Sequence, residues 1–334
     1  MMKQLSILIM ALAINVTLAA QKPFITTWKT DNPGISRDNQ IVIPTIGFGY
    51  YYEVDWGDGT KEKAVTGDAF HTYDKPGTYQ VSITGEFPSI YFNSAGDSQK
   101  ILSVDQWGDI NWKSMTRAFK GCNFLHVWAK DAPKLKNTKD LSSMFESAIL
   151  FNESIDHWSL ETVEDLSYMF KDAISFNQKI NSWNVSNVTD MSGLFWNATA
   201  FNQSLAKWQV SNVRNMAYMF WRATSFNQPI NDWNVERVNS MGAMFEGAYN
   251  FNQDISNWNV SNVNILTGMF MGASSFNQDV AHWRVDNALD ISNMFSYSGL
   301  SYENYELLVL NWKRRPAFRN KLNLESLTVS LVKQ

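Results

Sequence analysis

The sequence has little of the chemistry on which most enzymes depend. Its single cysteine, Cys122, excludes an internal disulfide. Its four histidines form neither an HExxH motif nor a group with metal-ligand spacing. Glycine-rich phosphate loops are absent, and the charged residues, 18% of the chain, are scattered. We therefore expect no metal, no cofactor and no catalytic site.

Basic residues are not in excess either. The chain has 28 Lys and Arg against 32 Asp and Glu, a formal net charge of −4. Nucleic-acid-binding proteins usually carry a basic face. The mild acidity therefore argues against a nucleic-acid partner.

The one long apolar run stands at the N-terminus. Lys3, the apolar residues 5–12 and the small-residue end Leu18-Ala19-Ala20 are typical of a secretory signal peptide over residues 1–20. No cysteine lies near the expected cleavage site, so a lipid anchor there is excluded, and no later run is long enough to span a membrane. We expect a secreted or cell-surface protein that begins at Gln21.

A strict repeat dominates the rest of the chain. The pair Phe-Asn recurs every 25 residues, and a tryptophan follows each phenylalanine seven places later. The phenylalanines are Phe151, Phe176, Phe201, Phe226, Phe251 and Phe276. A fixed period of this length is typical of a solenoid of stacked coils, which usually presents an extended binding surface.

The apolar positions within one repeat predict its local structure. Val188, Met191, Leu194, Phe195 and Ala198 are spaced as one face of a helix. The Phe-Asn-Gln segment is too short for a helix and resembles a brief strand. We therefore predict an α/β solenoid in which each coil has a short strand, a loop and about two helical turns.

Two recurring side chains have structural and functional interpretations. The asparagine after each phenylalanine could bond the next coil or form a polar binding stripe, and we favour a structural ladder. Its members are Asn152, Asn177, Asn202, Asn227, Asn252 and Asn277. The recurring tryptophans could be sugar-stacking platforms, but their register with the apolar positions favours the core.

The segments around the repeats predict caps, because a solenoid must cover its apolar ends. A distorted copy places the N-terminal cap at residues 96–140, before a repeat region at 141–299. Helical spacing from Tyr302 to Trp312 predicts a C-terminal cap within residues 300–334. The last residues could form a strand or a short helix.

Residues 21–95 form a separate unit with alternating strands and tight turns. Its motifs WGDGT (56–60) and HTY-x-x-PGTY-x-V (71–81) resemble the PKD-type immunoglobulin-like domain, which implies a small β-sandwich. Asp55 and Asp58 could bind calcium, but carboxylates that stabilise the turn are the favoured interpretation.

The repeats also resemble a known family. Segments such as Trp-Asn-Val-Ser-Asn-Val-Thr-Asp-Met (183–191) and Met219-Phe220 followed by Phe226-Asn227-Gln228 are similar to the BspA-type leucine-rich-repeat-like surface proteins of bacteria. The resemblance covers residues 100–312. It implies a secreted or surface-exposed protein that adheres to an extracellular protein or glycan. No anchoring domain is evident after Trp312, so the mode of surface retention stays open.

We consider two functions. The first is a non-enzymatic binding or adhesion protein, and the second is a carbohydrate-active or peptide-processing enzyme built on the repeats. Cys122 and His126 could pair on a helix as nucleophile and base, but a small buried cysteine is the usual case. Since no titratable cluster supports an enzyme, we favour binding.

One variable position suggests where a ligand binds. The residue after the second phenylalanine of each repeat changes from copy to copy, so we expect it on an outer helical face. Its occupants are Glu146, Lys171, Trp196, Trp221, Glu246 and Met271. Trp196 and Trp221 would stand side by side with Arg222 beside them, and Met271 would lie further along. Exposed tryptophan with arginine is typical of binding hot spots. Alternatively, the two indoles bury each other.

Overall fold

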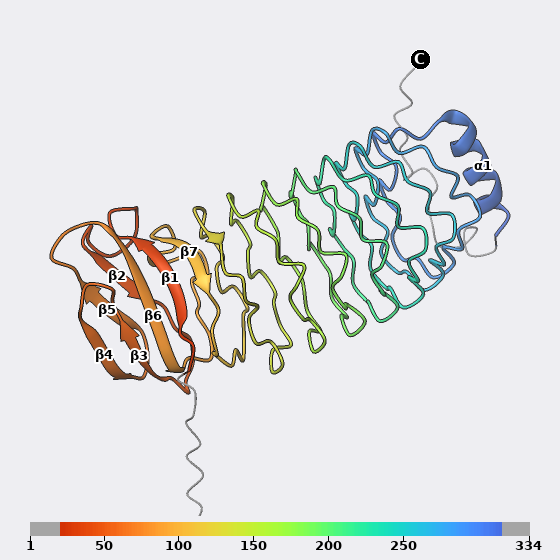
Figure 1. The fold of residues 1–334 in the computed structure, drawn as a ribbon. Helices are drawn as coiled ribbons and strands as arrows, with labels where there is room; N and C mark the ends of the chain where they lie inside the picture. The colour runs from red at the N-terminus through yellow and green to blue at the C-terminus, as the bar shows by residue number, and fades with distance from the viewer. Residues whose placement is uncertain (1–20, 316–334) are drawn as a thin grey trace, which may run out of the picture.

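The protein is described here by a computed structural model that covers residues 21–315. The predicted signal peptide and the predicted terminal strand or helix lie outside these residues. Figure 1 shows strands at one end, a long stack of repeats in the middle and the helix α1 at the other end. The elements are β1 (Phe24–Lys29), β2 (Gln40–Ile43), β3 (Tyr51–Asp55), β4 (Lys61–Val65), β5 (Ala69–Thr72), β6 (Thr78–Glu86), β7 (Ile101–Gln106), β8 (His126–Val127) and α1 (Tyr302–Lys313).

The strands form a small β-sheet region. A six-stranded sheet has the order β4-β3-β6-β1-β7-β8, and β2 pairs with β5 in a second sheet. The pairs are antiparallel except β7 with β8, which is parallel. The alternating burial of β1 reflects one face turned to a core that contains Trp28 and Tyr52. This sheet runs past residue 95, the boundary expected between the N-terminal unit and the cap.

The predicted 25-residue repeat is confirmed as a regular structural unit. Each repeat forms one layer, and isolated parallel bridges join equivalent residues of successive layers, such as Asp165 with Asp190 and Asp190 with Asn215. Figure 1 shows the layers following one another in sequence order, without contact between distant repeats. We call this region the repeat stack.

The helical turns predicted inside each repeat are wrong. Between residues 21 and 315, α1 is the only α-helix, and the repeats are built from successive turns. Two residues of each layer, four places apart, have positive φ, for example Tyr168 (56°) and Asp172 (57°). A residue in the left-handed region interrupts an α-helix. Tight turns, and not a helix, therefore direct the regularly spaced apolar residues into the core.

Backbone hydrogen bonds explain why these turns are stable. The amides of Leu166, Tyr168, Phe170 and Asp172 donate to carbonyls of the next layer at 2.8–3.0 Å. Four such bonds join each adjacent pair of layers in the stack. In all four bonds the donor is an amide of one layer and the acceptor is a carbonyl of the layer that follows it in the chain, so each layer fixes the backbone of the next. The layer-to-layer bonds offset the cost of the left-handed residues.

Aromatic columns fill the core of the stack. Phe176 and Phe201 have ring centroids 5.9 Å apart and nearly parallel planes, and Phe195 lies 4.0 Å from Phe201. The recurring tryptophans are buried too. The indole N–H of Trp208, for instance, donates to the Ile180 carbonyl of the previous layer at 3.0 Å.

The two ends of the stack differ. At the N-terminal end, the amides of Phe92, Asn93 and Ser94 donate to carbonyls of the first layer. At the C-terminal end, α1 buries Leu308 and Trp312 against the last layer. The last layer nevertheless keeps a row of backbone amides with no acceptor among residues 21–315. These are the amides of Ile291, Asn293, Phe295 and Tyr297.

Candidate functional site

An aromatic patch crosses three layers of the repeat stack. We define it as Tyr168, Trp196, Tyr218 and Trp221. The two indoles lie 4.5 Å apart, Tyr218 lies 5.0 Å from Trp196, and Tyr168 lies 6.2 Å from Trp196. Trp196 and Trp221 are therefore neighbours, as their positions one period apart predict.

The repeat geometry positions these rings. Trp196 and Trp221 share one position in successive layers, and Tyr168 and Tyr218 share another position two layers apart. Gly193 occupies the tyrosine position in the layer between, where a Cβ would lie 2.4 Å from the Tyr168 ring. The missing side chain thus leaves room for Tyr168 to lie over the next layer, toward Trp196.

Two cations lie on the patch. The Lys171 ammonium is 5.4 Å from the centre of the Trp196 ring and 5.9 Å from that of Tyr168. The Arg222 guanidinium lies 4.3 Å from the Trp221 ring. All three distances are within the range of cation–π attraction. The patch therefore combines aromatic surface with positive charge.

A glutamate lies near each cation, and the one beside Lys171 forms an ion pair with it. Glu146 is buried and accepts from Lys171 at 3.0 Å and from Lys120 at 2.9 Å. Burial alone would raise the pKa of Glu146, but hydrogen bonds from Lys120, Ser143 and Lys171 outweigh it and lower the pKa. On the other side, burial raises the pKa of Glu246, against the opposing effect of Trp221 and Arg222.

The sequence left open whether the two indoles are exposed or bury each other, and their exposure in the structure is intermediate. Trp196 and Trp221 are half-buried because they pack on each other, while Tyr218 is 39% exposed and Arg222 is exposed. The expected outer helical face is wrong, since these residues lie on turns. Met271 lies two layers beyond Trp221, with Glu246 between them, so it is not part of the patch.

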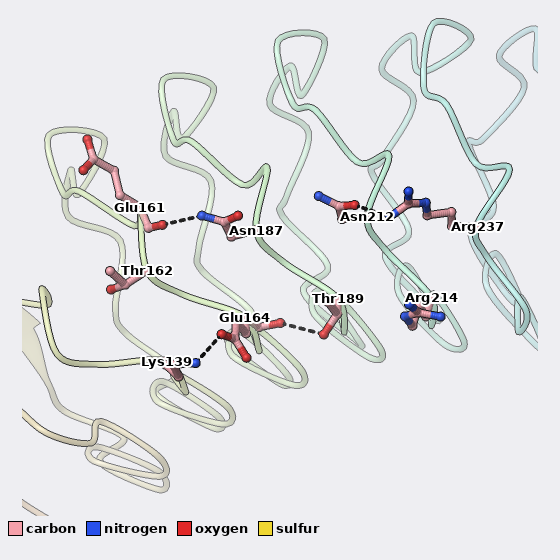
Figure 2. A pocket seen from close by; sticks show the side chains of 9 residues that line it. All are labelled: Lys139, Glu161, Thr162, Glu164, Asn187, Thr189, Asn212, Arg214 and Arg237. Atoms are coloured by element: carbon pink, nitrogen blue, oxygen red, sulfur yellow. Dashed lines mark hydrogen bonds and ion pairs between the residues drawn. The ribbon is translucent and has the colours of Figure 1, made fainter.

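Two neighbouring shallow hollows share lining residues, and the first of them adjoins the patch. One, of about 390 Å³, is lined by Tyr168 and Tyr218 together with polar residues of the intervening layers. The other, of about 440 Å³, is shown in Figure 2. Its lining residues are Lys139, Glu161, Thr162, Glu164, Asn187, Thr189, Asn212, Arg214 and Arg237.

Arg214 links the two hollows, because it lines both together with Thr189. Figure 2 shows Lys139 paired with Glu164 and Arg237 bonded to Asn212, at 2.6 and 2.7 Å. The Arg214 side chain, in contrast, is exposed and has no ion pair among residues 21–315. It is a cation available to a ligand beside an aromatic surface.

The recurring asparagines join one layer to the next. Asn177 donates its backbone N–H to the side-chain oxygen of Asn152 at 2.8 Å, and Asn202 bonds Asn177 in the same way at 2.9 Å. The series continues through Asn227, Asn252 and Asn277. It ends where Ser301 and Asn304 of the cap donate to Asn277. The asparagine side chains are thus engaged in layer-to-layer bonds.

Other candidates from the sequence have local partners. Asp55 pairs with Lys61 at 2.9 Å, and Asp58 bonds Thr60 and His71. Cys122 is fully buried, which raises the pKa of its thiol. Within residues 21–315, no three His, Cys, Asp or Glu residues are grouped so that they could hold a metal ion. No helix of that range is long and apolar enough to cross a membrane.

Sequence reasoning missed the two tyrosines of the patch. A signal was present, because the position three residues before Trp196 and Trp221 reads Tyr168, Gly193, Tyr218 in successive copies. When tyrosine and glycine alternate at one position, the tyrosine rings can extend over the layer that carries the glycine.

The comparisons identify the repeats. The architecture is a small β-sheet region followed by a regular stack of 25-residue repeats. The family model described as "Mycoplasma protein of unknown function, DUF285" matches residues 113–228 and 203–306, which together span more than half of the chain. The chain belongs to this family. No curated protein and no solved structure matches it.

Proposed function

We propose that this protein is an extracellular binding or adhesion protein whose repeat stack recognises a protein or glycan ligand. The observation that carries the proposal is the aromatic patch, where Trp196 and Trp221 pack against each other beside Arg222. Tryptophan and arginine together are the residues most enriched at binding hot spots. The adjoining hollow and the exposed Arg214 that lines it would extend the contact surface.

The resemblances noted in the sequence support this function. The repeats resemble BspA-type leucine-rich-repeat-like surface proteins, and the N-terminal unit resembles a PKD-type domain. In this interpretation the stack is a solenoid that presents the binding surface, and the immunoglobulin-like unit is a spacer. The N-terminal segment with the features of a signal peptide would direct the chain to the outside of the cell.

A direct experiment is to probe glycan and matrix-protein arrays with purified residues 21–334. We expect a saturable ligand whose binding survives removal of divalent cations, since the proposed surface needs no metal. The matched control is the Leu289→Ala variant, which changes a highly exposed residue of the last layer. Absence of any saturable ligand on both arrays would contradict the proposal.

A further inference from the structure

A second aromatic platform lies near the start of the stack, at the end of β8. Trp128 is 54% exposed, although its backbone N–H is fixed by the Val104 carbonyl at 2.9 Å. It faces a hollow of about 330 Å³. The hollow is lined by Val127, Trp128, Ala129, Lys130, Glu153, Ser154 and His157. None of these residues belongs to the aromatic patch.

Neighbouring side chains hold the Trp128 indole in place. The His126 ring stacks on Trp128 with centroids 5.4 Å apart and planes only 13° from parallel. His126 in turn bonds Glu153 through Nδ1 at 2.7 Å. The second oxygen of Glu153 accepts the backbone N–H of Val127 at 3.1 Å. One face of Trp128 is therefore supported by the imidazole, and the side chain is preorganised for a ligand.

The charges around the hollow favour an anionic group. The Glu153 carboxylate is engaged by His126 and Val127, and the nearby Asp131 accepts the backbone amides of Trp107 and Gly108. The Lys130 ammonium has no ion pair within the described part of the chain. The cation without a partner at this hollow is thus Lys130.

The openness of the site favours a sugar over an apolar ligand. A purely apolar group on a half-exposed indole would stay partly in water and gain little from burial. A pyranose ring can instead lay its C–H face on the indole while its hydroxyl groups remain hydrated. Ser154 in the lining supplies a hydroxyl partner for the ring.

We propose that the Trp128 hollow binds a pyranose that carries a carboxylate, with the ring stacked on Trp128 and the carboxylate paired with Lys130. His126 is a positioning residue, because its ring supports the indole. Glu153 lines the hollow, but both of its oxygens are bonded to His126 and Val127. This site is independent of the aromatic patch, so the two can fail or succeed separately.

The test is calorimetric titration of residues 21–334 with trigalacturonate, a hyaluronan tetrasaccharide and sialyllactose. The methyl ester of whichever acidic sugar binds is the neutral comparison. We expect at least one acidic sugar to bind, and we expect Trp128→Ala to weaken it at least tenfold. Lys130→Met should weaken the acid tenfold and leave the methyl ester unchanged. The control Tyr297→Ala removes another exposed aromatic ring, at the far end of the stack, and should bind as the parent does.

Several results would overturn the proposal. They are binding by none of the three acidic sugars, undiminished binding by Trp128→Ala, or equal affinity for the acid and its methyl ester. Circular dichroism of each variant separates loss of binding from loss of folding. Binding that is lost in Trp196→Ala but kept in Trp128→Ala would assign the sugar to the aromatic patch and also contradict the inference.

Discussion

The side-chain oxygen of Asn202 accepts the backbone N–H of Asn227, the equivalent residue of the next layer, at 3.0 Å. It also accepts the side-chain amide of Gln228 at 3.0 Å. One asparagine thus satisfies two donors of the neighbouring repeat. The repeats are held together by side-chain bonds as well as by backbone bonds.

Replacement of Asn202 by alanine should therefore destabilise the stack. The Asn227 amide loses its acceptor, and an unsatisfied, partly buried donor costs about 1–3 kcal/mol. Lys207→Ala, at an exposed position of the same repeat, should cost less than about 0.5 kcal/mol. Chemical denaturation of both variants measures the difference, and equal midpoints would contradict the role assigned to Asn202.

The left-handed residues of each layer predict an unusual effect of glycine. Ala243 has a φ of 53°, where an L-residue is strained, so Ala243→Gly should stabilise the protein by about 1 kcal/mol. Ala248 lies in the same layer but outside the left-handed region, so Ala248→Gly should destabilise it by about 0.5–1 kcal/mol. The two unfolding free energies should move in opposite directions. A loss of stability in both variants would count against the turn geometry.

Hydrogen exchange should locate the open end of the stack. In the layer before the last, the backbone amides of Leu266, Gly268 and Phe270 donate to carbonyls of the last layer. The amide of Met271, in contrast, donates within its own layer, to the Gly268 carbonyl. We expect the amides of Ile291, Asn293, Phe295 and Tyr297 to exchange faster than the equivalent amides one layer earlier, since they have no described acceptor. Slow exchange at all four would show that a further acceptor covers this edge.

The N-terminal sheets should lose stability in acid through Asp58. Burial tends to raise its pKa, but hydrogen bonds from Thr60 and His71 outweigh that and hold the pKa at about 2. Because the folded pKa lies below the ordinary value of 3.8, the stabilisation is complete above about pH 5. It is lost as the pH falls toward 2. The stability difference between the parent and Asp58→Asn should shrink over that interval, and a constant difference would be inconsistent with it.

The period and the buried positions of the repeat could be predicted from sequence. Phe176, Trp183 and Met191 recur in fixed positions, and all three are buried. The local structure could not be predicted in the same way. Spacing alone does not distinguish a helix from successive turns. The left-handed positions carry glycine only in some copies, such as Gly193, and are filled by residues such as Tyr168 and Ala243 in others.

The adjacency of Trp196 and Trp221 also follows from the period. The contacts of Trp196 with Tyr168 and Tyr218 do not follow from the period. They run diagonally between layers and depend on the side-chain direction at a left-handed residue. The Trp128 platform could not be predicted from the sequence either. It lies in the irregular segment before the repeats, where no periodicity places His126 beneath it.

The most direct test of the account is the affinity of the Trp196→Ala, Trp221→Ala double variant for the ligand found on the arrays. The paired indoles and the cation on them form the centre of the proposed surface, and removal of a hot-spot side chain typically costs at least about 2 kcal/mol. The account predicts a loss of more than tenfold in affinity with the fold retained. Full affinity in a folded double variant would contradict it.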